Sequence, residues 1–77
     1  MKRISIDLHG YTADEARSQL MGLLKNCPPG VDEIEVIHGS NRGQAVMNMV
    51  RSLSHKKIER KILGLNSGIT VLQLRKY

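Results

Sequence analysis

Three residues, Asp7, His9 and His38, form the candidate acid–base set of this 77-residue sequence. Imidazoles titrate near neutral pH, so one histidine can accept a proton while another donates one. Such a pair could cleave a phosphodiester without a metal, above all in RNA, whose 2′-hydroxyl is an internal nucleophile. Asp7 could orient an imidazole, stabilise its charged form or hold a cation. The alternative is that each histidine only makes structural hydrogen bonds at a tight turn.

A polar, glycine-bearing turn follows the second histidine and could bind a phosphate. It consists of Gly39, Ser40, Asn41, Arg42 and Gly43. Glycine tolerates positive φ and lets backbone amides approach a phosphate closely. Asn41 is the non-glycine residue best able to adopt a left-handed conformation there, and Arg42 can fork onto a phosphate. The alternative is an ordinary turn before a helix, with a solvated arginine.

The chain is basic, with 12 Lys and Arg against 7 Asp and Glu, a net charge of +5 and a pI near 9.8. This balance indicates a polyanionic partner or an anionic surface. Lys57 and Lys61 alternate away from Ile58 and Ile62, so we expect both lysines on the exposed face of their strand. There they would give salt-dependent phosphate binding. A merely solvated strand face is the alternative.

The composition also narrows the mode of binding and the class of protein. Tyr11 and Tyr77 are the only aromatic residues, so binding through phosphates, grooves or shape fits better than base stacking. Cys27 is alone, which excludes an internal disulfide and a zinc-binding cysteine pair. No apolar stretch approaches a membrane span, and residues 4–7 are too short for a signal segment. We therefore expect a cytoplasmic, monomeric domain without a cofactor, with Asp7 as the place where a divalent cation could bind.

Alternating and helical patterns predict six elements in the order βαβαββ. Strands are expected at residues 3–8, 33–37, 58–63 and 69–74, and helices at residues 13–27 and from 45 to about 54. Thr12 and Glu15 form a capping box that starts the first helix, and Pro28-Pro29-Gly30 ends it. So short a chain has a thin core, which favours one domain over residues 1–77 with two packed layers.

This order of elements brings the two histidines together. Each strand-to-helix junction ends in an apolar residue followed by His-Gly, as Leu8-His9-Gly10 and as Ile37-His38-Gly39. A strand-helix-strand crossover makes its two strands parallel. If those strands are neighbours, both histidines lie at the carboxyl edge of one sheet, where helix N-termini favour anions and ligands generally bind.

Four segments taken together resemble the Smr (small MutS-related) domain family. They are Asp7-Leu8-His9-Gly10, Thr12 with Glu15-Ala16, Val36-Ile37-His38-Gly39, and Asn66-x-Gly68-x-Thr70. The resemblance implies an α/β (α+β) two-layer sandwich with a four-stranded mixed sheet, similar to the C-terminal domain of bacterial translation initiation factor three. It implies Asp7, His9, His38 and Gly39 as site residues. Asn41 stands where the family commonly has glycine.

The resemblance also implies a substrate. Members of the family bind nucleic acid, and several are endonucleases that nick DNA or cut RNA, including ribosome-linked substrates. We therefore expect a nucleic-acid-binding domain whose acid–base set cuts RNA, or nicks branched or duplex DNA as in DNA repair. The alternatives are a non-catalytic module that recognises RNA, DNA or a ribosomal surface, and a small-anion or protein-interaction domain that uses the same edge.

Overall fold

A computed structural model of the chain describes residues 1–39, 44–63 and 66–75. Its elements are β1 (Arg3–Asp7), α1 (Ala13–Lys25), β2 (Glu33–Ile37), α2 (Ala45–Ser52), β3 (Ile58–Leu63) and β4 (Ile69–Leu74). The predicted order is confirmed, although β1 ends one residue earlier than expected and both helices end two residues early. No helix in the described ranges is long and apolar enough to cross a membrane.

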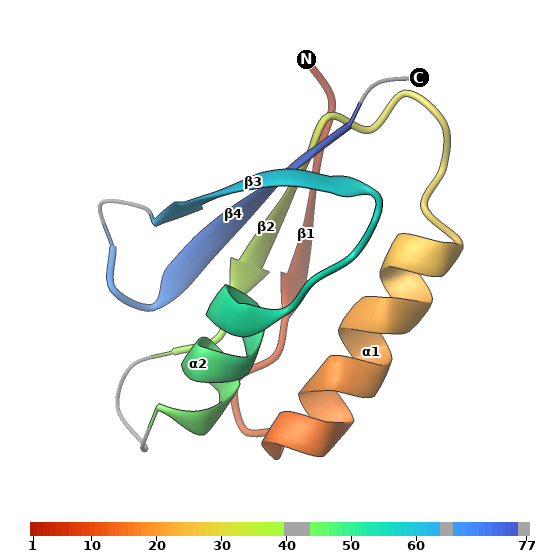
Figure 1. The fold of residues 1–77 in the computed structure, drawn as a ribbon. Coiled ribbons are helices and arrows are strands. Elements are labelled where there is room, and N and C mark those ends of the chain that lie inside the picture. The colour runs from red at the N-terminus through yellow and green to blue at the C-terminus, as the bar shows by residue number, and fades with distance from the viewer. Residues whose placement is uncertain (40–43, 64–65, 76–77) are drawn as a thin grey trace.

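The four strands form one mixed sheet in the order β1-β2-β4-β3. β1 and β2 are parallel, whereas β4 runs antiparallel to both β2 and β3. Both helices lie on the same side of this sheet (Figure 1). The molecule is thus the two-layer α+β sandwich that the family resemblance implied.

The core lies between the helices and one face of the sheet. Alternation along the strands sends Ile34 and Val36 of β2 and Leu72 of β4 to that face, where all three are fully buried. Leu20 and Leu24, one helical turn apart on α1, are also fully buried and meet this face. The two central strands and one stripe of α1 therefore supply most of the apolar burial.

β3 departs from the regular alternation that the sequence predicted. It carries one extra residue between Ile58 and Arg60 relative to β4, and such a bulge turns the following side chains to the opposite face. Lys61 consequently faces the helices, while Ile62 is 40 % exposed. The prediction that Lys57 and Lys61 share the exposed face of the strand was wrong. For Lys61 it assumed an unbroken alternation, whereas Lys57 precedes the strand and its ammonium reaches the end of α1.

The two lysines instead reach the C-terminal ends of the helices. The Nζ of Lys57 donates to the carbonyl of Leu24 at 2.6 Å and to that of Lys25 at 3.3 Å, and the Nζ of Lys61 donates to the carbonyl of Arg51 at 2.8 Å. Carbonyls at a helix end have no partner within the helix, and a cation complements the negative end of the helix dipole. Both lysines therefore stabilise the packing of helices on β3.

Candidate nucleic-acid interface at the carboxyl edge of the sheet

The two His-Gly turns meet at one edge of the sheet, as predicted. Parallel pairing sets Asp7 opposite Ile37, so the residues that follow each strand emerge side by side. A Cβ atom built on Gly39 would lie 3.7 Å from the Cβ of His9. The first His-Gly turn therefore packs directly against the second.

Both turns need glycine after the histidine. Gly10 has φ +84° and Gly39 has φ +75°, values that residues with a Cβ rarely adopt. At each position the chain leaves a strand and must change direction before the next helix. The His-Gly repeat in the sequence thus reflects the same backbone device used twice.

His9 and Asp7 form an exposed hydrogen-bonded pair. One carboxylate oxygen of Asp7 accepts from the backbone N–H of His9 at 3.0 Å and from the ring Nδ1 at 2.5 Å. The His9 side chain is 72 % exposed and the Asp7 side chain is 52 % exposed. Because a carboxylate only accepts, the proton is on Nδ1, and no described residue hydrogen-bonds to Nε2. The neutral ring therefore offers solvent a nitrogen that can accept a proton.

The same contacts set the charge of the carboxyl group. The hydrogen bond from the His9 ring, and after it the one from the His9 backbone, hold the pKa of Asp7 below its usual 3.8. Asp7 is therefore ionised at neutral pH. A carboxylate fixed beside Nδ1 selects the tautomer of His9.

His38 has the opposite environment. Its side chain is buried, its Nδ1 lies 2.9 Å from the carbonyl oxygen of Gly39, and its Nε2 lies 2.9 Å from the hydroxyl of Thr70. Since a carbonyl only accepts, Nδ1 donates, and Nε2 of the neutral ring accepts from the Thr70 hydroxyl. The structure thus brings the two predicted histidines to one edge but exposes only the ring of His9.

The segment Asn66-x-Gly68-x-Thr70 holds the second His-Gly turn in place. The carbonyl of Gly68 accepts from the backbone N–H groups of His38 at 2.9 Å and Gly39 at 3.0 Å, and the Asn66 side chain accepts from the Gly68 N–H at 2.8 Å. A Cβ on Gly68 would lie 3.3 Å from Oδ1 of Asn66 and 3.4 Å from the Cα of Gly39, so a side chain here would press on the Asn66 amide that binds the Gly68 N–H. These three residues belong to the site although the sequence prediction assigned them no role.

Residues 6–75 match the sequence model of the Smr domain. The chain belongs to the Smr domain family. Among solved structures, it is similar to the Smr domain of MutS2 from Thermus thermophilus, at 26 % identity and a TM-score of 0.74, over 99 % of this chain and 100 % of that one. No protein with curated annotation matches the chain. The resemblance inferred from four short segments is thus confirmed over nearly the whole sequence.

The start of α1 adds less to anion binding in this Smr domain than a bare helix N-terminus would. The predicted capping box is present: Thr12 Oγ1 accepts from the Glu15 N–H at 3.2 Å, and Glu15 Oε1 accepts from the Thr12 N–H at 2.9 Å. With Asp14 also in the first turn, two carboxylates and the cap already occupy the positive end of the helix.

Two further predictions on the Smr site concern a loop and a cation. Ser40, Asn41, Arg42 and Gly43, predicted to bind phosphate, lie outside the described residues. Within the described ranges, no three His, Cys, Asp or Glu side chains gather into a metal site. The described part of the candidate interface therefore consists of the Asp7–His9 pair beside the second turn, which is hydrogen-bonded to Gly68.

Proposed function

We propose that this Smr domain binds nucleic acid at the carboxyl edge of the sheet and cleaves RNA there, with His9 as the acid–base residue. The supporting observation is the exposed Asp7–His9 pair, in which the carboxylate fixes Nδ1 and leaves Nε2 open to solvent. A general base needs the correct tautomer and a path to the proton that it removes. His9 meets both conditions.

The proposed reaction uses the nucleophile that RNA itself carries. Nε2 of His9 takes the proton of a 2′-hydroxyl, the 2′-oxygen bonds to the adjacent phosphorus, and the bond from phosphorus to the 5′-oxygen breaks. The leaving 5′-oxygen takes a proton from water, giving a 2′,3′-cyclic phosphate and a 5′-hydroxyl. Asp7 stabilises the imidazolium until it returns its proton to solvent.

In this proposal His38 transfers no proton and instead holds the second turn in position. We expected His9 and His38 to exchange roles as acid and base, but both ring nitrogens of His38 already have partners and the side chain is only 6 % exposed. Its contribution is to hold Gly39, and through Gly39 the point where the chain leaves for residues 40–43. Arg42 and its neighbours would then contact the phosphate.

A non-catalytic module is the second candidate, and the burial of His38 is the observation that favours it. A single exposed imidazole cannot act as acid and base in one step. In that case the same edge would recognise RNA, DNA or a ribosomal surface without forming a product.

The deciding experiment incubates the protein with end-labelled RNA and with supercoiled plasmid, with and without a chelator. Positioned acid–base groups typically contribute about 10² to 10⁴ in rate, so His9→Ala should slow RNA cleavage by about 100-fold or more while binding persists. Gln19→Ala is the control, because that side chain is exposed on α1 and lies outside the edge. Binding by the wild type without any product would support the module, undiminished cleavage by His9→Ala would remove His9 from the mechanism, and loss of cleavage in chelator would indicate a cation at Asp7.

A further inference from the structure

The positive charge of the chain is unevenly distributed over its surface. On the face of the sheet opposite the helices, Arg3 forms ion pairs with Glu33 at 2.7 Å and with Glu35 at 3.7 Å, and Ser5 also donates to Glu35. Carboxylates therefore neutralise the basic residue on this part of β1.

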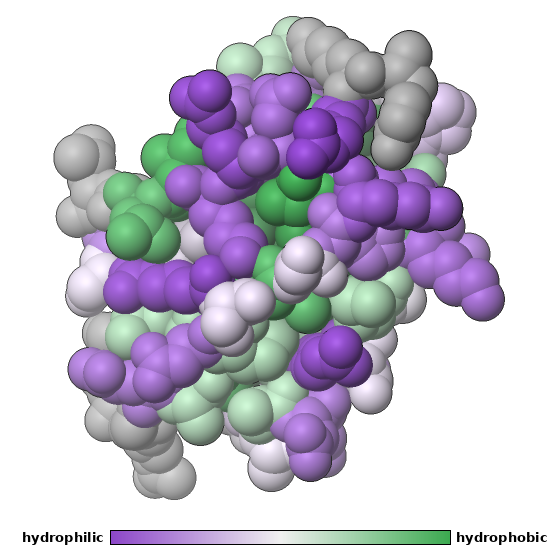
Figure 2. Space-filling model, in the orientation of Figure 1, coloured by the Kyte–Doolittle hydropathy of each residue, from purple (hydrophilic) through white to green (hydrophobic). Residues whose placement is uncertain are grey.

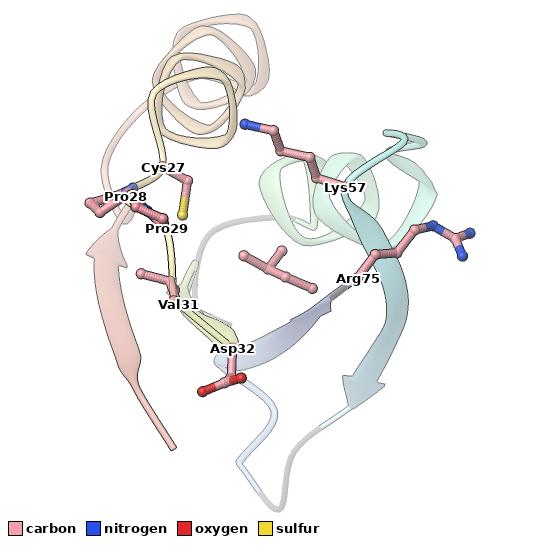
Figure 3. Close-up of a pocket in the computed structure, with 9 residues that line it drawn as sticks. Cys27, Pro28, Pro29, Val31, Asp32, Lys57 and Arg75 are labelled. Atoms are coloured by element: carbon pink, nitrogen blue, oxygen red, sulfur yellow. The ribbon is translucent and has the colours of Figure 1, made fainter. Parts of the chain in front are cut away.

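Four cationic residues gather where α1 ends beside the start of β3. They are Lys25, Lys56, Lys57 and Arg75, here termed the helix-end surface. Lys57 reaches the end of α1 through the carbonyl of Leu24, and the Nε of Arg75 donates to the carbonyl of Lys56 at 3.0 Å. In Figure 3, Lys57 extends towards α1 while Arg75 points away from it. These contacts join three separate segments of the chain at this end of the molecule.

A hollow of about 400 Å³ opens within this surface. It is lined by Met21, Gly22, Lys25, His55, Lys56 and Lys57. None of these is acidic, so no lining carboxylate competes with an anion for the two exposed lysines, Lys25 and Lys56. The stems of the lysines and Met21 supply apolar walls, and a histidine adds a hydrogen-bonding ring.

A second hollow, of about 450 Å³, shares Lys57 with the first. Figure 3 shows the residues that line this second hollow. Arg75 lines one side of this second hollow, and Asp32 is the acidic residue that lines it. The Asp32 side chain already accepts the backbone N–H of Lys2 at 2.8 Å. Cationic residues therefore line both hollows, and the acidic residue belongs to the one farther from Lys25.

Hydrophilic side chains cover much of the upper half of the molecule in Figure 2, over β3 and the adjoining segments. Exposed apolar side chains occur at the other end of β3, where Ile62 and Leu63 are 40 % and 57 % exposed. A polar surface rich in lysine fits the phosphates of a nucleic acid better than it fits an apolar protein partner.

We propose that the helix-end surface is a second phosphate-binding surface, which holds the same nucleic acid at a distance from His9. This inference rests on the proposed function. α1 begins just after the first His-Gly turn and ends at Lys25, and its 13 residues at 1.5 Å each separate the two places by about 20 Å. At 3.4 Å per stacked nucleotide, a strand must be about six nucleotides long to touch both. The substrate is therefore an extended strand or duplex and not a mononucleotide.

The test measures binding of a fluorescent RNA of about 12 nucleotides, twice the length needed to span both places, over a range of salt concentrations. The double variant Lys25→Gln/Lys56→Gln removes two exposed charges from the helix-end surface. Each lost phosphate contact lowers the slope of log K against log salt by about 0.7 to 0.9, so the slope should fall by about 1.4 to 1.8. The matched control, Arg17→Gln/Arg60→Gln, removes two exposed charges elsewhere. Its slope should fall by less than that of Lys25→Gln/Lys56→Gln.

A second RNA of about four nucleotides, too short to span about 20 Å, separates the two surfaces. Its binding at the edge, followed by the NMR signals of the His9 ring, should be equal for the wild type and the Lys25→Gln/Lys56→Gln variant. Equal salt slopes for the two double variants with the longer RNA would overturn the inference and leave the proposed function standing. If the wild type binds neither the long nor the short RNA at low salt, both the inference and the proposed function are overturned.

Discussion

Two histidines in the same local sequence, each followed by glycine, have opposite roles because of strand alternation. Asp7 falls on the open face with Arg3 and Ser5, whereas His38 continues the series of Ile34 and Val36 into the core. The alternation was visible in the sequence and could have predicted a buried His38. The convergence of His9 and His38 was predicted on the condition that β1 and β2 are neighbours, and the sheet order meets that condition. The role of Thr70 was not predicted, since its contact with His38 spans 32 residues.

The Asp7–His9 pair makes a prediction about pH. Because the folded pKa of Asp7 lies below 3.8, the stabilisation from this pair is present above that pH and is lost as the pH falls through the lowered value. The side-chain carboxyl carbon of Asp7, followed by NMR, should titrate below 3.8. In His9→Ala, which removes the ring bond that is the largest cause of the shift, the midpoint should rise towards 3.8. A midpoint at 3.8 in the wild type would contradict the pair.

The buried contact between His38 and Thr70 makes a second prediction. Thr70→Val keeps the shape of the side chain but leaves Nε2 of His38 buried without a partner, which should lower the free energy of unfolding by about 1–3 kcal/mol. Urea unfolding measures this loss, and the ¹⁵N shift of Nε2 reports whether the hydrogen bond is gone. Thr70→Ser retains the hydroxyl and should keep the ¹⁵N shift. Unchanged unfolding and unchanged shifts in Thr70→Val would show that the contact has no role.

At the scale of elements, the periodicity of the sequence was sufficient to predict the strands and the faces of their side chains, except where the backbone is irregular. The predicted bounds of β2, β3 and β4 agree with the structure, because each strand reads as alternating or β-branched residues between turn signals. The bulge in β3 was not predictable, since Ile58 and Ile62 alternate with Lys57 and Lys61 as they would in a regular strand. Only pairing with β4 reveals the extra residue. The bulge places Lys61, a candidate phosphate ligand, on the helix side of the sheet.

The capping box of α1 should be measurable as helix stability. Thr12→Ala removes the acceptor of the Glu15 N–H and should lower the free energy of unfolding by about 1 kcal/mol in a urea titration. Ser18→Ala is the matched control, because it removes a hydroxyl from an exposed position inside the same helix. A loss no greater for Thr12→Ala than for Ser18→Ala would mean that α1 is held by packing alone.

At the scale of the whole molecule, a thin core makes single core residues decisive. Leu24→Ala should cost about 2–5 kcal/mol, because the side chain is fully buried between α1 and the sheet. A core this small rarely supplies more than about 3–5 kcal/mol in total, so we expect the variant to be largely unfolded at 25 °C by circular dichroism. Leu63→Ala deletes the same atoms from a side chain that is 57 % exposed and should change stability by about 0.5 kcal/mol or less. Similar losses of stability in Leu24→Ala and Leu63→Ala would contradict a core between α1 and the sheet.

The hydrogen bonds between the Gly68 carbonyl and the N–H groups of His38 and Gly39 can form only after the last strand has begun to be synthesised. Asp7, His9 and His38 come early in the chain, but the carbonyl that fixes the second turn and the hydroxyl that binds His38 come from residues 68 and 70. β4, which lies between β2 and β3, is the last of the six elements to be synthesised. Synthesis therefore completes the candidate site residues first and the residues that hold the second turn last. A chain interrupted before residue 68 lacks the contacts that hold His38 and Gly39 in place.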